Sequence, residues 1–189
     1  MPRSKIKQIK HLKHQRGFTL LELTTSIALL GVLSSTALTK YADLEGDTRS
    51  AVLNGVSAAL NTATTLTHLQ ASLQNKLAGK IQTINYSGKY VKVKNGFPIA
   101  DWASAIHPIM VMNVAAVDSD TQKICSDFDF CASSNANIKN SLPAYFPLSS
   151  DELVVIWMEG YQLSDHCFAY FHNPDNGNMP SSSTVTTGC

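Results

Sequence analysis

The stretch RGFTLLEL at residues 16–23 determines how this chain is organised, because a basic segment gives way there to an apolar one. Residues 1–17 contain six lysine and arginine side chains and no acidic one. Residues 18–38, by contrast, contain one charged side chain, Glu22. A helix of this length would be about 31 Å long, which matches the ~30 Å hydrocarbon core of a bilayer. The pattern predicts a membrane-spanning helix with its basic flank in the cytoplasm.

Three interpretations of the apolar stretch are compatible with its length and its charge. It is a secretory signal peptide cut near residues 35–37, an uncleaved membrane anchor, or a segment whose cleavage point precedes it. Glu22 helps to separate them, because a carboxylate at the centre of a membrane helix costs about 2.5–3.5 kcal/mol, and less near the interface. Only a segment that pairs this charge with a partner gains from having it.

Residues 16–23 resemble the type IV prepilin signature. In that family a prepilin peptidase cuts after the glycine, and the new N-terminal phenylalanine is methylated. The resemblance implies cleavage between Gly17 and Phe18, N-methylation of Phe18, and pairing of Glu22 with the terminal amine of a neighbouring subunit. Such pairing is physically reasonable, since an amine and a carboxylate are each costly in lipid and much less costly together.

A second resemblance covers residues 40–55, KYADLEGDTRSAVLNG. They are similar to the segment that follows the membrane helix in MSHA (mannose-sensitive haemagglutinin) pilins. Many type IV pilins carry a proline about 22 residues into the mature chain, where this sequence has Thr39. A proline-driven break is therefore not expected here, and any local melting would centre on Gly31 or Gly46.

Apolar side chains recur every three or four residues beyond the membrane segment, which predicts that the helix continues to about residue 78, with Gly79 as its stop. We expect a cleaved leader over 1–17, a transmembrane or filament-core helix over 18–38, an amphipathic continuation over 39–78, and a globular region over 79–189. The side chains of the predicted buried stripe are Leu53, Val56, Leu60, Ala63, Leu66, Leu69 and Leu73.

The globular region has the pattern of short strands separated by turns, and residues 118–150 are polar and loop-like. A helical piece is predicted from Pro98 to Ile106, stopped before Pro108. A long helix followed by antiparallel strands is an α+β arrangement, and the resemblance implies a pilin-type αβ roll. The predicted strands are 89–94, 153–158, 167–171 and 184–187, with turns at 86–89 and 174–177.

The four cysteines, Cys125, Cys131, Cys167 and Cys189, allow three disulfide pairings. An exported region with an even number of cysteines favours disulfides over a metal site. Local pairing of Cys125 with Cys131 and of Cys167 with Cys189 is the most economical choice. The second pair resembles the C-terminal disulfide loop of type IV pilins. A zinc site that includes His166 or His172 is the competing interpretation, although no C-x-x-C spacing is present.

No motif in the sequence indicates catalysis: a nucleophile elbow, a phosphate loop and a zincin signature are all missing. Two acidic pairs, Asp118 with Asp120 and Asp127 with Asp129, are candidates for calcium, although such pairs in polar loops are more often only solvated. No cofactor is expected. Residues 18–189 carry a net charge of 9 − 14 = −5, which argues against nucleic acid as a partner. Trp102 and Trp157 are predicted to be core residues.

These features together predict a structural subunit of a bacterial type IV, MSHA-like pilus, used for adhesion or attachment, and not an enzyme. The implied partners are the prepilin peptidase, other pilin subunits and, before assembly, the inner membrane. The assembled subunit would then be part of an extracellular pilus. One alternative is a pseudopilin of a type II secretion system, which a calcium site would favour. A second alternative is a periplasmic binding domain on an uncleaved anchor.

Overall fold

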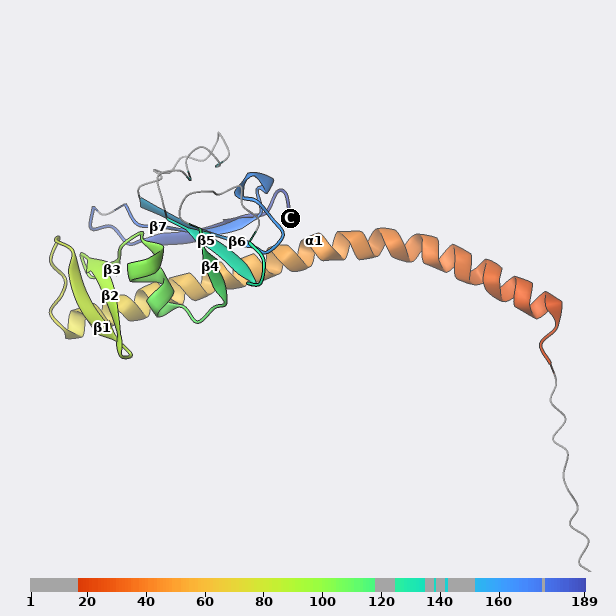
Figure 1. Cartoon of the computed structure of the whole chain (residues 1–189), viewed down its shortest axis with the longest axis horizontal. Helices are drawn as coiled ribbons and strands as arrows, with labels where there is room; N and C mark the ends of the chain where they lie inside the picture. Colours follow the sequence, from red (N-terminus) through yellow and green to blue (C-terminus); the bar gives the residue numbers. More distant parts are fainter. Residues whose placement is uncertain (1–16, 118–124, 135–137, 139–141, 143–151, 175) are drawn as a thin grey trace, which may run out of the picture. The chain divides into compact units, whose positions relative to one another are not determined.

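The computed structural model describes residues 17–117, 125–134, 138, 142, 152–174 and 176–189. It contains two compact units, Met1–Asp43 and Leu44–Cys189, and we call the second unit the head. The long helix α1 (Leu20–Leu73) has 54 residues and contributes to both units (Figure 1). Residues 1–16, which belong to the predicted leader, lie outside the described residues.

The head contains two sheets in addition to its part of α1, so the α+β class predicted from the sequence is confirmed. The first sheet is antiparallel, with the order β1-β2-β3. The second has the order β4-β5-β6-β7-β8 and is antiparallel except for the parallel pair β4 and β5. The strands are β1 (Gln82–Tyr86), β2 (Lys89–Lys94), β3 (Phe97–Pro98), β4 (Val114–Ala116), β5 (Phe130–Ser133), β6 (Leu153–Met158), β7 (Phe168–His172) and β8 (Ser181–Val185).

Two tight turns give the first sheet its shape. Ser87 and Gly88 between β1 and β2 both have positive φ, 50° and 83°, which is the pattern of a type I′ hairpin turn. Asn95 and Gly96 between β2 and β3 repeat it, with φ of 54° and 79°. The predicted turn at 86–89 and the predicted end of the strand at Asn95-Gly96 are therefore both present.

The buried face of α1 differs from the predicted stripe in its last third. Leu53, Val56, Leu60 and Ala63 are buried as predicted, but Leu66, Leu69 and Leu73 are 47%, 55% and 79% exposed. The predicted stripe advances by three residues three times in a row, from Leu60 to Leu69. Each step of three residues falls about 60° short of a full turn on a helix of 3.6 residues per turn. These leucines therefore rotate away from the core. Thr64, Thr67 and Ala71 take the buried positions instead.

The helix ends earlier than predicted, at Leu73 rather than near residue 78. Asn75 has a φ of 55°. Its amide donates to the Ser72 carbonyl at 3.1 Å, and the Lys76 amide donates to the Ala71 carbonyl at 2.8 Å. These two bonds form the Schellman motif that closes many helices, with asparagine where glycine is more usual. Asn75 therefore stops the helix before the predicted stop, Gly79.

Several predicted elements of the head need correction. The prediction of residues 118–150 as loop missed β5 (Phe130–Ser133), and β1 and β4 were not predicted at all. The last strand lies at Ser181–Val185 rather than at 184–187. The helical piece predicted from Pro98 begins later, at Trp102, because Pro98 belongs to β3. It is a π-helical turn, η1 (Trp102–Ile106), and a 3₁₀ turn, η2 (His107–Ile109), continues it through Pro108. Proline is tolerated there because its missing N–H is not needed in a first turn.

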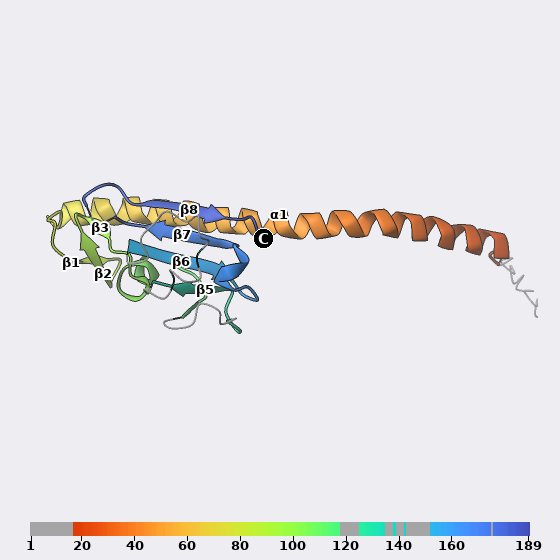
Figure 2. The ribbon, with the colours of Figure 1, turned by 90° about the horizontal axis from the view of Figure 1, so that it is seen from above.

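Strand β6 is buried on both faces, which explains why its sequence, LVVIWM, is continuously apolar. Val154 and Ile156 belong to the core that α1 covers, whereas Val155 and Trp157 belong to a second core on the opposite face of the sheet. Trp102 lies in the first core, so the prediction that both tryptophans are core residues is confirmed. Figure 2 shows α1 running along the sheet beside β8.

Candidate functional site

The predicted cleavage point lies immediately before α1. Gly17, Phe18 and Thr19 precede the first helical residue, Leu20, and are not helical themselves. Phe18 is 87% exposed. The Gly17–Phe18 peptide bond is therefore in non-helical, exposed backbone, which is the kind of segment that a peptidase active site can accept.

Glu22 makes a reciprocal set of hydrogen bonds with Thr19. Its Oε2 accepts from the Thr19 amide and from the Thr19 hydroxyl, each at 3.1 Å, and the Thr19 hydroxyl oxygen accepts from the Glu22 amide at 3.2 Å. This is a capping box, in which a threonine N-cap and a glutamate three residues later satisfy amides of the first turn. This capping role was not predicted above, although T-x-x-E before an apolar run is the usual sequence signal for it.

The first part of α1 has the length and composition to cross a membrane. Leu20–Leu38 has a mean hydropathy of 1.5 over 19 residues, and none of it is buried. Its serine and threonine hydroxyls bond back to helix carbonyls: Thr25 Oγ1 donates to the Leu21 carbonyl at 2.9 Å, and Ser34 Oγ donates to the Leu30 carbonyl at 2.7 Å. These hydroxyls therefore need no outside partner in an apolar environment.

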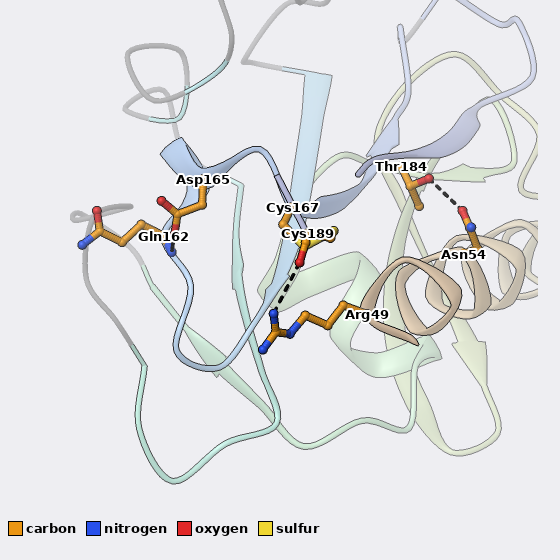
Figure 3. The surroundings of a disulfide bond; sticks show 7 residues. All are labelled: Arg49, Asn54, Gln162, Asp165, Cys167, Thr184 and Cys189. Carbon is orange, nitrogen blue, oxygen red and sulfur yellow. Dashed lines mark hydrogen bonds between the residues drawn. A yellow bond between two sulfur atoms is a disulfide. The ribbon is translucent and has the colours of Figure 1, made fainter. Parts of the chain in front are cut away.

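The C-terminal residues of the head are attached to α1 by several contacts (Figure 3). A disulfide joins Cys167, just before β7, to Cys189. The Arg49 guanidinium donates to the Cys189 carbonyl at 3.3 Å, and the Thr184 hydroxyl donates to Asn54 Oδ1 at 2.8 Å. Arg49 also forms an ion pair with Glu45 one turn earlier on the helix. This C-terminal clasp connects β8 and the residues after it to residues 45–54 of α1.

The second disulfide joins Cys125 to Cys131, so both local pairings are present and no cysteine is free for zinc. Asp127 and Asp129 lie in the loop that this disulfide closes, whereas Asp118 and Asp120 lie outside the described residues. Within the part of the chain that the structure describes, no group of three His, Cys, Asp or Glu side chains could hold a metal ion.

An apolar groove of about 560 Å³ opens on the head beside α1. Val52, Val56 and Leu66 of α1 line one side, and residues 109–112 line the other. Val111 in that segment is 99% exposed. An exposed apolar surface of this kind is typical of a contact with another protein.

Comparison with known proteins supports the interpretation of the N-terminus. Residues 12–38 match the family model described as the prokaryotic N-terminal methylation motif. The chain is also 35% identical over 97 residues to a fimbrial protein of Neisseria meningitidis serogroup B, and 34% identical to one of serogroup A. Each match covers 48% of this chain and 57% of the relative, a little more than half of its length. No solved structure matches this chain significantly.

The helix, the motif and these relatives together support a type IV pilin-like chain. Neither comparison distinguishes an MSHA-like pilin from a pseudopilin.

Proposed function

We propose that this chain is a structural subunit of a bacterial type IV pilus of the MSHA-like group, used for adhesion or attachment, with no catalytic role of its own. The observation that carries the proposal is the N-terminus of α1. There Gly17, Phe18 and Glu22 stand at the start of a helix whose first 19 helical residues, Leu20–Leu38, are mostly apolar and are unburied. A segment of that kind needs an apolar partner outside its own chain, either lipid or other helices.

In this proposal the precursor is inserted in the inner membrane with residues 1–17 in the cytoplasm. A prepilin peptidase cuts between Gly17 and Phe18, and Phe18 is N-methylated. Assembly then moves the apolar helix from lipid into a bundle of pilin helices, and the head becomes part of an extracellular pilus. The Glu22 carboxylate pairs with the Phe18 amine of a neighbouring subunit, which compensates two charges that are each costly in an apolar environment.

The MSHA-like assignment is supported by the resemblance of residues 40–55, and the two disulfides favour a pilin over a pseudopilin. A pseudopilin shares the N-terminal features, and it remains the alternative to test. Calcium titration of the purified head, followed by its thermal melting temperature, separates the two. Stabilisation by calcium would favour the pseudopilin, and no change would favour the pilin.

The proposal predicts the chemistry of the mature N-terminus. Intact-mass and peptide mass spectrometry of the chain isolated from cells should show a chain that begins at Phe18 and carries one N-methyl group. A Gly17→Ile variant should instead accumulate with its leader attached, because a branched side chain would occupy the residue on which the peptidase acts. A mature chain that begins near residue 37, or that keeps residues 1–17, would exclude the prepilin interpretation.

A further inference from the structure

The charges of the head are divided along the sequence. Residues 48–100 contain six basic side chains and no acidic one, whereas residues 101–189 contain ten acidic side chains and two basic ones. A net charge calculated for the whole chain conceals this division. The fold places many of the described charges at two different ends of the head.

One end of the head is basic. The β1–β2 hairpin lies at the C-terminal end of α1 (Figure 1), where Gln74 Nε2 donates to the Asn85 carbonyl at 2.8 Å. Val91 and Val93 of β2 point into the core, so the alternate residues Tyr90 and Lys92 face outward, and Tyr90 is 74% exposed. We call Lys76, Lys80, Lys89 and Lys92 the lysine end. Among the described residues, none of these four lysines forms an ion pair.

The direction of β8 identifies the opposite end. Ser182 Oγ donates to the Ser57 carbonyl, and Cys189 lies against Arg49, so the chain runs back along α1 towards residue 49. The register then places Phe168 opposite Val185 and Trp157 opposite Phe168. The C-terminal end of β6 therefore lies towards residue 49 and away from the hairpin.

Three exposed carboxylates gather at that end of β6. The register pairs Phe130 with Met158, and the Glu159 amide donates to the Asp129 carbonyl at 3.1 Å. Asp127 is two residues before Asp129 in the same loop. We call Asp127, Asp129 and Glu159 the acidic end. The nearby Arg49 is already engaged, because it contacts Glu45, the Cys189 carbonyl and the Tyr161 ring.

Two other described acids are held by neighbours of their own. The Glu152 carboxylate lies 3.5 Å from His172 Nε2. The Asp101 carboxylate accepts hydrogen bonds from the amide and the hydroxyl of Ser104. Neither is paired with the lysine end, which is therefore left with uncompensated positive charge among the described residues.

We propose that the lysine end of one head docks on the acidic end of the head of a second copy of this chain. The proposal rests on the pilus-subunit function, and it adds a contact between heads to the contact between helices. Charge complementarity between the ends favours a second copy as the occupant. The two surfaces are different, so the contact is heterologous and does not have to close into a dimer. A heterologous contact whose rotation does not close into a ring repeats as an open array, which is what a filament requires.

Charge reversal tests this contact in cells that assemble the full-length chain. A Lys89→Glu/Lys92→Glu variant places like charges opposite each other, and sheared surface filaments should fall about tenfold or more. An Asp129→Lys/Glu159→Lys variant should show the same loss. The chain that carries all four substitutions restores opposite charges and should recover filaments. A Lys89→Arg/Lys92→Arg variant keeps the charge and should assemble as the wild type does.

Two accompanying measurements make each outcome interpretable. Thermal melting of each full-length variant, purified in detergent, shows that it folds, and mass spectrometry shows whether the chain still begins at Phe18. If correctly folded and processed chains with four substitutions fail to assemble, the docking contact is wrong although the pilus function stands. A wild-type chain that never forms filaments would remove the pilus function itself. If Lys89→Glu/Lys92→Glu assembles normally but no longer binds heparin, the lysine end binds an anionic polymer and the proposal is overturned.

Discussion

The two parts of α1 use apolar side chains in opposite ways. Over Leu20–Leu38 the apolar side chains are exposed on every face of the helix, and none of them is buried by the rest of the chain. From Leu53 to Ala71 the apolar side chains that are buried form one stripe, which packs in the core of the head. A helix with apolar side chains on all faces indicates an apolar environment outside the chain. A helix with a single apolar stripe indicates that the stripe packs in a core of the same chain. The comparison therefore separates apolar residues that are left for a partner outside the chain from apolar residues that stabilise the head.

The largest effect, on the yield of surface filaments, is expected from removing the Glu22 carboxylate in the exposed part of α1. Glu22→Ala removes both the capping box and the carboxylate, whereas Glu22→Gln keeps a side chain that can complete the capping box. If Glu22 pairs with the amine of a neighbouring subunit, both variants should be processed at Gly17 but should give almost no surface filaments. The measurement is the yield of sheared filaments, by immunoblot, relative to processed chain in the membrane.

A third variant provides the matched control for Glu22. Thr19→Ala removes the N-cap hydroxyl and leaves the charge, so it should cost the helix only about 1 kcal/mol and should still assemble. Normal filaments from Glu22→Gln, together with their loss in Glu22→Ala, would instead assign Glu22 to capping alone.

A smaller but still large effect is expected in the buried stripe. Leu60→Ala should lower the free energy of unfolding of the head by about 2–5 kcal/mol, because Leu60 is fully buried and its truncation leaves a cavity in the core. Leu69→Ala on the same helix and Leu30→Ala in the exposed part should each change it by less than about 0.5 kcal/mol. Urea unfolding in detergent, followed by tryptophan fluorescence, reports on the head, because both tryptophans are buried there. An equal loss of stability in Leu30→Ala would mean that the comparison between the two parts is wrong.

Much of this fold follows from local patterns in the sequence. Strand β6 was predicted from its run of six apolar residues, and β2 was predicted because lysines alternate with valines. Strand β5 was not predicted, because its sequence, FCAS, does not alternate between apolar and polar residues. The strand is defined instead by its pairing with β6. Strand β1 has only Ile84 fully inside, so its signal was weak. These strands depend on partners that are distant in the sequence, and no short window of sequence contains them.

The candidate site divides in the same way. Gly17, Phe18 and Glu22 were recognisable because they lie within one stretch of eight residues, 16–23, and the capping box at Thr19 could have been recognised from the same stretch. The two ends of the head could not be predicted. The sequence shows the charge division between residues 48–100 and 101–189, but only the strand registers place Asp129 and Glu159 far from the β1–β2 hairpin.

The smallest effect is expected where the buried part of α1 stops. Asn75 has a φ of 55°, and a left-handed conformation costs a residue with a Cβ roughly 1–2 kcal/mol, less for asparagine and nothing for glycine. Asn75→Ala should therefore lower the free energy of unfolding by about 1 kcal/mol, whereas Asn75→Gly should leave it equal or slightly higher, in the same urea titration. If Asn75→Ala were neutral, the helix would be able to continue towards residue 78. The turn at Asn75 would then not be what positions Gln74 to hold the β1–β2 hairpin, and with it the lysine end, against the end of α1.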